Sequence, residues 1–158
     1  MTEVQIDVAE LAKKSSVSWI RVSGETYPVW HEWIETTGDD DAAVGAICVV
    51  GSLEQDGSEQ RLPRLGNGDA AIVLLRGKAD RQLAASVPVV TSVVEPGSDL
   101  WDPVTAALKS GRLNAPDLPT MVERWAEKCL VLRLVPSDAA TTAADLPDVH
   151  PRTSPRLS

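Results

Sequence analysis

The chain has 158 residues, of which 43% are hydrophobic and 24% charged, so it can bury the core of one ordinary domain. Its formal net charge of −8 disfavours nucleic acid or an anionic membrane surface as a partner, because both repel an acidic protein. No apolar run approaches the roughly 20 residues that span a bilayer, and residues 1–14 lack the pattern of a signal peptide. We therefore expect a cytoplasmic protein.

The first segment, DVAELAKK at 7–14, predicts a short helix, because Asp7 and Glu10 are spaced almost as in a capping box. Segments of strand character follow, with turns at SGET and TTGDDD between them: VSWIRV (17–22), YPVWHEWI (27–34) and VGAICVV (44–50). This arrangement predicts a meander of antiparallel strands. The polar, glycine-containing stretch 51–69 predicts a loop or an extended hairpin arm.

The second half continues the sheet and then changes to a helical period. The predicted elements are strands at 70–79 and 87–95, a helix from Ser98 to Gly111, a second helix from Pro116, and a strand at 129–135. Residues after Pro136 have too little apolar surface to offset the entropy of ordering them. The sequence thus predicts one domain at 1–136 and a flexible tail at 137–158.

About six strands joined by hairpin turns, with two or three helices mainly near the C-terminal end, predict a mainly β (α+β) fold. The expected architecture is a small antiparallel barrel or sandwich. Strands do not alternate with helices, and no Gly-x-Gly-x-x-Gly or phosphate-binding Gly-Lys-Ser/Thr motif is present. Doubly wound nucleotide-binding folds are therefore disfavoured.

The two cysteines do not suggest a metal site or a nucleophile. Cys48 and Cys129 stand far apart in apolar runs, without Cys-x-x-Cys spacing or clustered histidines. Such cysteines are typically buried, inert thiols. A hydrolase built on Cys48 and His31 is disfavoured because nothing in the sequence would orient the base. We expect no bound metal.

The large rings gather in YPVWHEWI. If this stretch is one strand, Trp30 and Trp33 lie on opposite faces and cannot both line one pocket. At least one of them must pack in the core or against a partner subunit. Trp19, Trp101 and Trp125 lie where core or dimer packing is expected.

Several segments, taken in order, resemble the actinobacterial members of the pyridoxamine 5′-phosphate oxidase-like family of FMN-binding split β-barrels. They are VSWIRV, PVWHEWI, a hairpin ending in EQRLP, VLLRGKADRQL, and EPGSDLWDPVTAALKSGRLN followed by ERWAEKCLVLRLVP. The resemblance covers nearly the whole chain up to Pro136. It implies an antiparallel six-stranded split β-barrel with two or three peripheral helices. It also implies a homodimer that holds FMN or the related deazaflavin between subunits and transfers hydride to or from a small-molecule substrate.

The resemblance also implies which residues hold the cofactor. Its phosphate is expected at basic side chains on and after a barrel strand, where this chain has Arg76, Lys78 and Arg81. Arg76 and Lys78 are two residues apart and so project from one face of a strand. They can grip a phosphate, or they can simply keep an exposed edge strand soluble.

Four further residues are candidates for cofactor contact. Trp30 and His31 could reach the flavin ring, and Gln60 and Arg61 could approach the cofactor from a loop at a subunit boundary. Alternatively, His31 is a half-buried structural histidine held by a backbone carbonyl. The chain lacks a serine or threonine cluster beside Arg76, and it carries the acidic insertion ETTGDDDAA. A cofactor-free barrel that acts as a binding or interaction module is therefore the second hypothesis.

Overall fold

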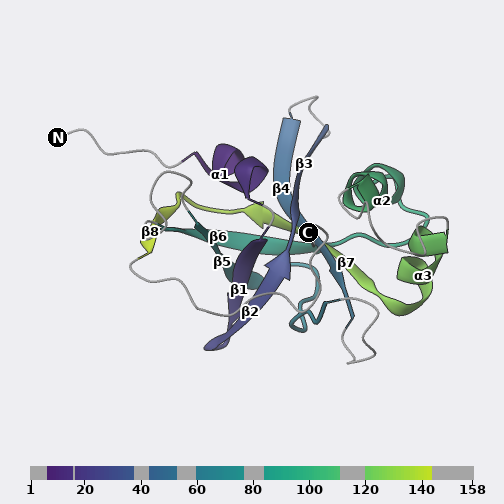
Figure 1. The fold of residues 1–158 in the computed structure, drawn as a ribbon, viewed down its shortest axis with the longest axis horizontal. Coiled ribbons are helices and arrows are strands. Elements are labelled where there is room, and N and C mark those ends of the chain that lie inside the picture. Colours follow the sequence, from purple (N-terminus) through teal and green to yellow (C-terminus); the bar gives the residue numbers. More distant parts are fainter. Residues whose placement is uncertain are drawn as a thin grey trace, which may run out of the picture.

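A computed structural model describes residues 7–15, 17–37, 43–52, 60–76, 84–110 and 120–143. These residues form three helices and eight strands (Figure 1). In chain order they are α1 (Val8–Lys14), β1 (Val17–Val22), β2 (Glu25–Trp30), β3 (Glu32–Thr37), β4 (Ala43–Gly51), β5 (Ala70–Arg76), β6 (Ala84–Val93), α2 (Trp101–Ser110), α3 (Met121–Lys128), β7 (Leu130–Pro136) and β8 (Thr141–Ala143). The prediction of a mainly β chain with a few helices is confirmed.

Seven strands form one continuous curled sheet in the order β2-β1-β5-β6-β7-β4-β3. All pairs between these strands in the described residues are antiparallel, and the short β8 adds to β6. The two end strands, β2 and β3, are consecutive in the chain and only His31 separates them. The two ends of the sheet therefore meet at His31, which produces a half-barrel (Figure 1).

The prediction of one strand at 27–34 is wrong, and with it the count of six strands. Trp30 pairs with Val17 on β1, whereas Glu32 pairs with Cys48 on β4. The residue pattern is compatible with a strand on either side of His31, but it carries no information about which neighbour each half pairs with. The chain crosses from one end of the sheet to the other at this point.

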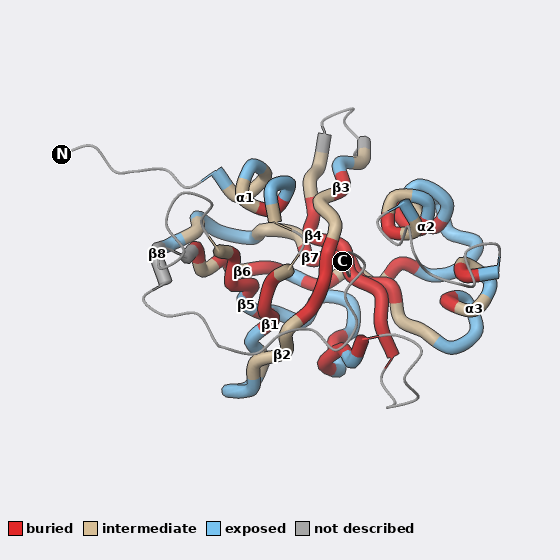
Figure 2. The backbone as a smooth tube through the Cα atoms, in the orientation of Figure 1, coloured by how far each residue is buried: buried red, intermediate tan, exposed pale blue. Residues whose placement is uncertain are grey.

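Alternation along the strands divides the buried side chains into two clusters. On β4, Ile47 and Val49 belong to the cluster inside the barrel, whereas Cys48 and Val50 belong to a second cluster beneath α2 and α3. Figure 2 shows β4 and β7 as the most continuously buried strands. Both faces of these strands are covered, and their sequences are therefore nearly continuous runs of apolar residues instead of alternating apolar and polar residues.

The tryptophans distribute over both clusters. Trp30 is fully buried in the cluster under the helices, whereas Trp33 packs against the cluster inside the barrel. This confirms that the two indoles lie on opposite sides of the chain. Trp101 and Trp125 are buried on the inner faces of α2 and α3, as expected from their helical spacing. Burying even a smaller apolar side chain such as leucine stabilises a fold by about 1.5–3 kcal/mol.

The helix predictions are confirmed in type, with shifted ends. In α1, the side chain of Asp7 accepts a hydrogen bond from the backbone N–H of Glu10 at 3.1 Å, which is the predicted cap. Helix α2 begins at Trp101 rather than at Ser98. Ser98 belongs to a turn before the helix, in which its carbonyl accepts a hydrogen bond from the N–H of Trp101. Gly111 and Pro116 lie outside the described residues. No helix in the described residues is long and apolar enough to cross a membrane.

The C-terminal part of the described chain adds one strand that was not predicted. Residues 141–143 of the predicted tail pair with Ala84–Ser86 as β8. The prediction of mobility for residues 144–158 falls outside the described residues. The strand at 129–135 is confirmed as β7, shifted by one residue.

Candidate functional site

Arg76 is the last residue of β5, and its guanidinium lies over the ring of Trp19 on β1. The distance from Arg76 Cζ to the ring centroid is 5.4 Å, which is within cation–π range. Trp19 is buried and pairs across the sheet with Leu74, so the ring is a fixed platform. Arg76 is half-buried, and its Nε–H is buried without a hydrogen-bond acceptor among the residues that the structure describes. The structure thus presents an oriented guanidinium with unused donor capacity.

The other two predicted phosphate ligands, Lys78 and Arg81, lie outside the described residues. Their predicted role beside Arg76 therefore stays a prediction. What the structure describes is that Arg76 stands at the strand end from which this basic segment continues.

Gln60 lies in the core and binds backbone. Its side chain accepts from Trp30 N–H at 2.7 Å and donates to the carbonyls of Trp30 at 3.0 Å and Val50 at 3.1 Å. The backbone of Gln60 also accepts from Ser52 N–H at 2.8 Å. These bonds give the end of β2 and the end of β4 the partners that a neighbouring strand would otherwise supply.

Gly51 makes this arrangement possible. A Cβ atom at Gly51 would overlap the carbonyl oxygen of Gln60, so only glycine lets the loop backbone approach β4 this closely. The hydrogen bonds of Gln60 account for all of its side-chain polar atoms. Contact between Gln60 and a cofactor stays a prediction, and the structure places the side chain away from the surface.

His31 and Trp30 are likewise buried. The Nε2 atom of His31 lies 3.0 Å from the carbonyl oxygen of Ala12, to which it donates from the neutral ring. Burial lowers the pKa of His31 from 6.5 to about 4, so the ring is uncharged at neutral pH. His31 therefore joins α1 to the point where β2 and β3 separate, in agreement with a structural histidine held by a backbone carbonyl. A role in contacting the flavin ring stays a prediction.

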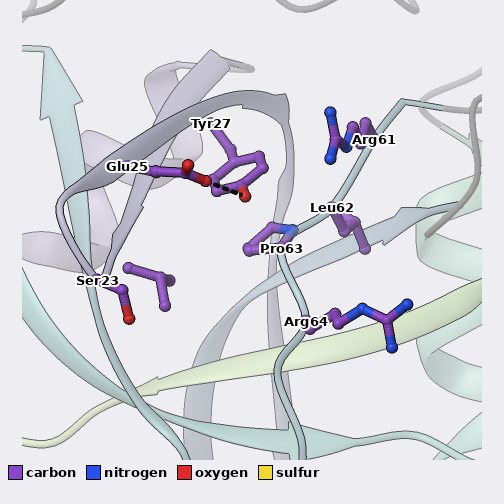
Figure 3. Close-up of a pocket in the computed structure, with 8 residues that line it drawn as sticks. Ser23, Glu25, Tyr27, Arg61, Leu62, Pro63 and Arg64 are labelled. Carbon is purple, nitrogen blue, oxygen red and sulfur yellow. Dashed lines mark hydrogen bonds between the residues drawn. The ribbon is translucent and has the colours of Figure 1, made fainter.

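Arg61 lies at a different place, in an open hollow of about 260 Å³ near the β1–β2 turn (Figure 3). Its walls are formed by that turn, by Glu25 and Tyr27 of β2, and by residues 61–64. The hydroxyl of Tyr27 donates to the carboxylate of Glu25 at 2.7 Å, and this bond raises the pKa of Tyr27. Arg64 extends away from Tyr27 in Figure 3.

The structure does not bring Arg61 and Arg76 together. Tyr27 pairs with Ile20, which belongs to the cluster inside the barrel, so the hollow lies on the inner side of β1–β2. Arg76 contacts Trp19, the next residue along β1, whose side chain projects to the other face. The predicted cofactor residues therefore occupy the outer sheet face (Arg76), the core (Trp30, His31, Gln60) and the hollow (Arg61).

The residues that the structure describes contain no group of three or more histidines, cysteines or acids that could hold a metal. Cys48 is buried, and desolvation raises its pKa to about 12, which keeps it a thiol at neutral pH. Cys48 is thus unsuited to act as a nucleophile, as the sequence predicted. Cys129 is half-buried at the end of α3.

No protein-family model matches the chain, and no curated protein matches it in sequence. Its fold is similar to the crystal structure of HutZ, the heme storage protein from Vibrio cholerae, at a TM-score of 0.50 and 12% identity, over 85% of this chain and 90% of that chain. It is equally similar to the general stress FMN/FAD binding protein from Xanthomonas citri, at a TM-score of 0.50 and 17% identity, over 95% and 94% of the two chains. Such identities show the fold alone, and that fold is a β-dominated, split-barrel-like architecture.

Proposed function

We propose that this protein binds a flavin, FMN or the related deazaflavin, and that Arg76 holds the cofactor's phosphate. The observation that carries the proposal is the buried Nε–H of Arg76: no group in the described part of the chain accepts its hydrogen, although the guanidinium is held over Trp19. A buried donor without a partner costs about 1–3 kcal/mol. A phosphate oxygen would accept this hydrogen and add a charge-assisted bond.

The residues around Arg76 fit a phosphate better than they fit a purely structural role. Stacking on Trp19 leaves the guanidinium plane restricted, which lowers the entropy lost when it binds a ligand. No carboxylate in the described part of the chain forms an ion pair with Arg76. Lys78 and Arg81 follow Arg76 in sequence, and we propose that they add positive charge to the same site.

A bound flavin would supply hydride transfer, and the described residues of this chain would bind and orient it. Nothing described near Arg76 offers an obvious proton donor. His31 is buried and bonded to Ala12, so its neutral ring is not placed for proton exchange with a substrate. We propose a redox reaction on a small molecule in which the protein chiefly positions the reactants.

Flavin is favoured over haem, although HutZ is a heme storage protein. Haem iron is usually held by an accessible histidine, cysteine, methionine or tyrosine. In the described ranges, His31 and Met121 are buried, and the hydroxyl of Tyr27 is engaged by Glu25. Cys129 is half-buried at the C-terminal end of α3, and this helix packs on the sheet, so the position of Cys129 does not favour it as a haem ligand. His150 lies outside the described residues.

We also propose that the protein is a homodimer. Ile72 and Val90 are the exposed large hydrophobic residues among those described, at 36% and 38% exposure. Ile72 pairs with Pro88, two residues before Val90, so both side chains project from the outer face of neighbouring strands β5 and β6. This patch also favours the second candidate function, a cofactor-free barrel that binds a protein partner.

Quenching of flavin fluorescence on titration with protein tests the proposal directly. We expect wild-type protein to bind FMN or deazaflavin, and Arg76→Met to weaken that binding by at least tenfold. Lys128→Met, which removes an exposed charge on α3, is the control and should bind as wild type does. Arg61→Met tests the hollow. If Arg61→Met weakens binding while Arg76→Met does not, the phosphate site is misassigned, and if wild type binds neither cofactor, the cofactor-free function is favoured.

A further inference from the structure

Arg133 stands in the middle of β7 and is only 8% exposed. It pairs with Cys48 on β4 and with Ser92 on β6, so its side chain leaves the sheet on the face covered by α2 and α3. Its flanking residues on that face, Val131 and Val135, belong to the apolar cluster there. A charged guanidinium is thus placed among apolar side chains.

The guanidinium is anchored at one point and unsatisfied at another. Its Nη2 atom donates to the hydroxyl of Thr36 on β3 at 3.1 Å, and its Nε–H is buried with no acceptor in the described ranges. The hydroxyl of Thr36 in turn donates to the carbonyl of Val44 at 3.5 Å. Thr36 therefore fixes the direction of the side chain and takes one of the two hydrogens on Nη2, the nitrogen that lies on the same side as Nε–H.

No described carboxylate forms an ion pair with this buried cation. Glu32 is on the same face of the sheet, but it pairs with Cys48 and lies four residues along β3 from Thr36. The Arg133 side chain extends toward Thr36 instead. The positive charge of Arg133 acts on the nearby Cys48, because it lowers the pKa of that thiol while burial raises it. Glu32 acts on the same thiol in the opposite sense, but among the described residues no carboxylate is within ion-pair distance of Arg133.

An arginine in this position is costly unless an anion accompanies it. Replacing buried charged groups by apolar side chains of similar volume is often neutral or stabilising. A methionine would suit the apolar surroundings formed by Val131 and Val135. A guanidinium retained at this buried position therefore points to an anionic partner that the described residues do not supply.

We propose that Arg133 binds an oxyanion of a small molecule, a carboxylate or a phosphate group, through its Nε–H and the second hydrogen of Nη2, whose first hydrogen goes to Thr36. These parallel donors match the two oxygens of such a group. The hydroxyl of Ser92 projects from the same face of the neighbouring strand and can donate a further bond. Because only 8% of Arg133 is exposed, a macromolecular surface cannot reach the guanidinium.

This site is separate from the proposed flavin site. Ser92 pairs with Arg133, and Ala84 pairs with Arg76, so the two arginines mark positions eight residues apart on β6. At about 3.3 Å per residue, this separation is roughly 26 Å. The two proposals can therefore fail independently, because a variant at one arginine leaves the other in place.

Thermal unfolding in added phosphate, acetate or chloride at equal ionic strength tests the proposal. When the concentration of phosphate or acetate is ten times its dissociation constant, we expect the midpoint temperature of wild-type unfolding to rise by about 3–6 °C. The rise should saturate at higher concentration. Chloride, which lacks paired oxygens, should not. The oxyanion with the larger saturable effect identifies the group that the site accepts. Equal shifts in all three salts, or no shift, would overturn the proposal.

Variants connect the effect to Arg133. Arg133→Met should abolish the oxyanion shift while its midpoint in chloride stays equal to or above that of wild type. Thr36→Val, which keeps the shape of the side chain, should weaken the shift by removing the anchor. Arg21→Met, which removes an exposed arginine on β1, is the control and should keep the shift in full. Marked destabilisation of Arg133→Met in chloride, with the shift retained in Thr36→Val, would assign Arg133 a structural role instead.

Discussion

Protonation of His31 should make the stability of this protein fall between pH 7.5 and pH 5.5. The ring is 1% exposed, and burial lowers its pKa from 6.5 to about 4. Above pH 6.5 the ring is neutral in both the folded and the unfolded chain. Below that pH the unfolded chain takes up a proton that the folded chain does not accept until about pH 4. Because the unfolded state then binds more protons, the free energy of unfolding decreases as the pH falls.

The magnitude follows from the difference of about 2.5 pKa units between 6.5 and 4. At 1.36 kcal/mol per unit, the complete loss is about 3 kcal/mol at pH below 4. Between pH 7.5 and pH 5.5 the same relation gives a loss of about 1 kcal/mol. Most carboxylates remain ionised above pH 5.5, so this window isolates the histidines.

Urea unfolding at both pH values measures the effect. His31→Gln can still donate to the Ala12 carbonyl but cannot take up a proton in this range, so its stability should change by much less than 1 kcal/mol between the two pH values. His150→Gln is the matched control, because the sequence has two histidines, and it should keep the wild-type pH dependence. If His31→Gln keeps the full slope, or His150→Gln loses it, the assignment to His31 is wrong.

Gln60→Ala should lower the free energy of unfolding by about 3 kcal/mol, since it leaves three buried backbone groups without partners; a loss below about 1 kcal/mol in chemical denaturation would contradict the role given to Gln60. Gly45→Ala should destabilise by more than about 1 kcal/mol, because a Cβ there overlaps the indole of Trp33; unchanged tryptophan fluorescence and an unchanged midpoint would argue against this packing. Ile72→Glu with Val90→Glu should convert a dimer to monomers in light scattering, and an unchanged mass would place the dimer interface elsewhere.

Local patterns were sufficient for the type of most elements. Alternating and β-branched segments predicted strands at 17–22 and 129–135, and the spacing of Trp101 and Val104 predicted α2. The break at His31 was missed because its cause is distant in sequence. Gln60 bonds the backbone of Trp30 from 30 residues away, and such a contact leaves no trace in the segment YPVWHEWI itself.

The candidate site was predicted only in part, for a related reason. A basic residue at a strand end is visible in sequence, so Arg76 was singled out, but its contact with Trp19 depends on the pairing of β1 with β5. Arg133 was missed because CLVLRLV reads as an ordinary apolar strand. Its unusual feature is burial without an ion pair among the described residues, and this exists only once α2 and α3 pack on that face of the sheet.

The measurement that tests the central claim most directly compares the affinity of wild-type protein for FMN and for riboflavin, which lacks the phosphate. If Arg76 grips that phosphate, FMN should bind at least tenfold more tightly, and Arg76→Met should reduce this preference to about one. Equal affinities of wild-type protein for the two compounds, or a preference that survives Arg76→Met, would contradict the account.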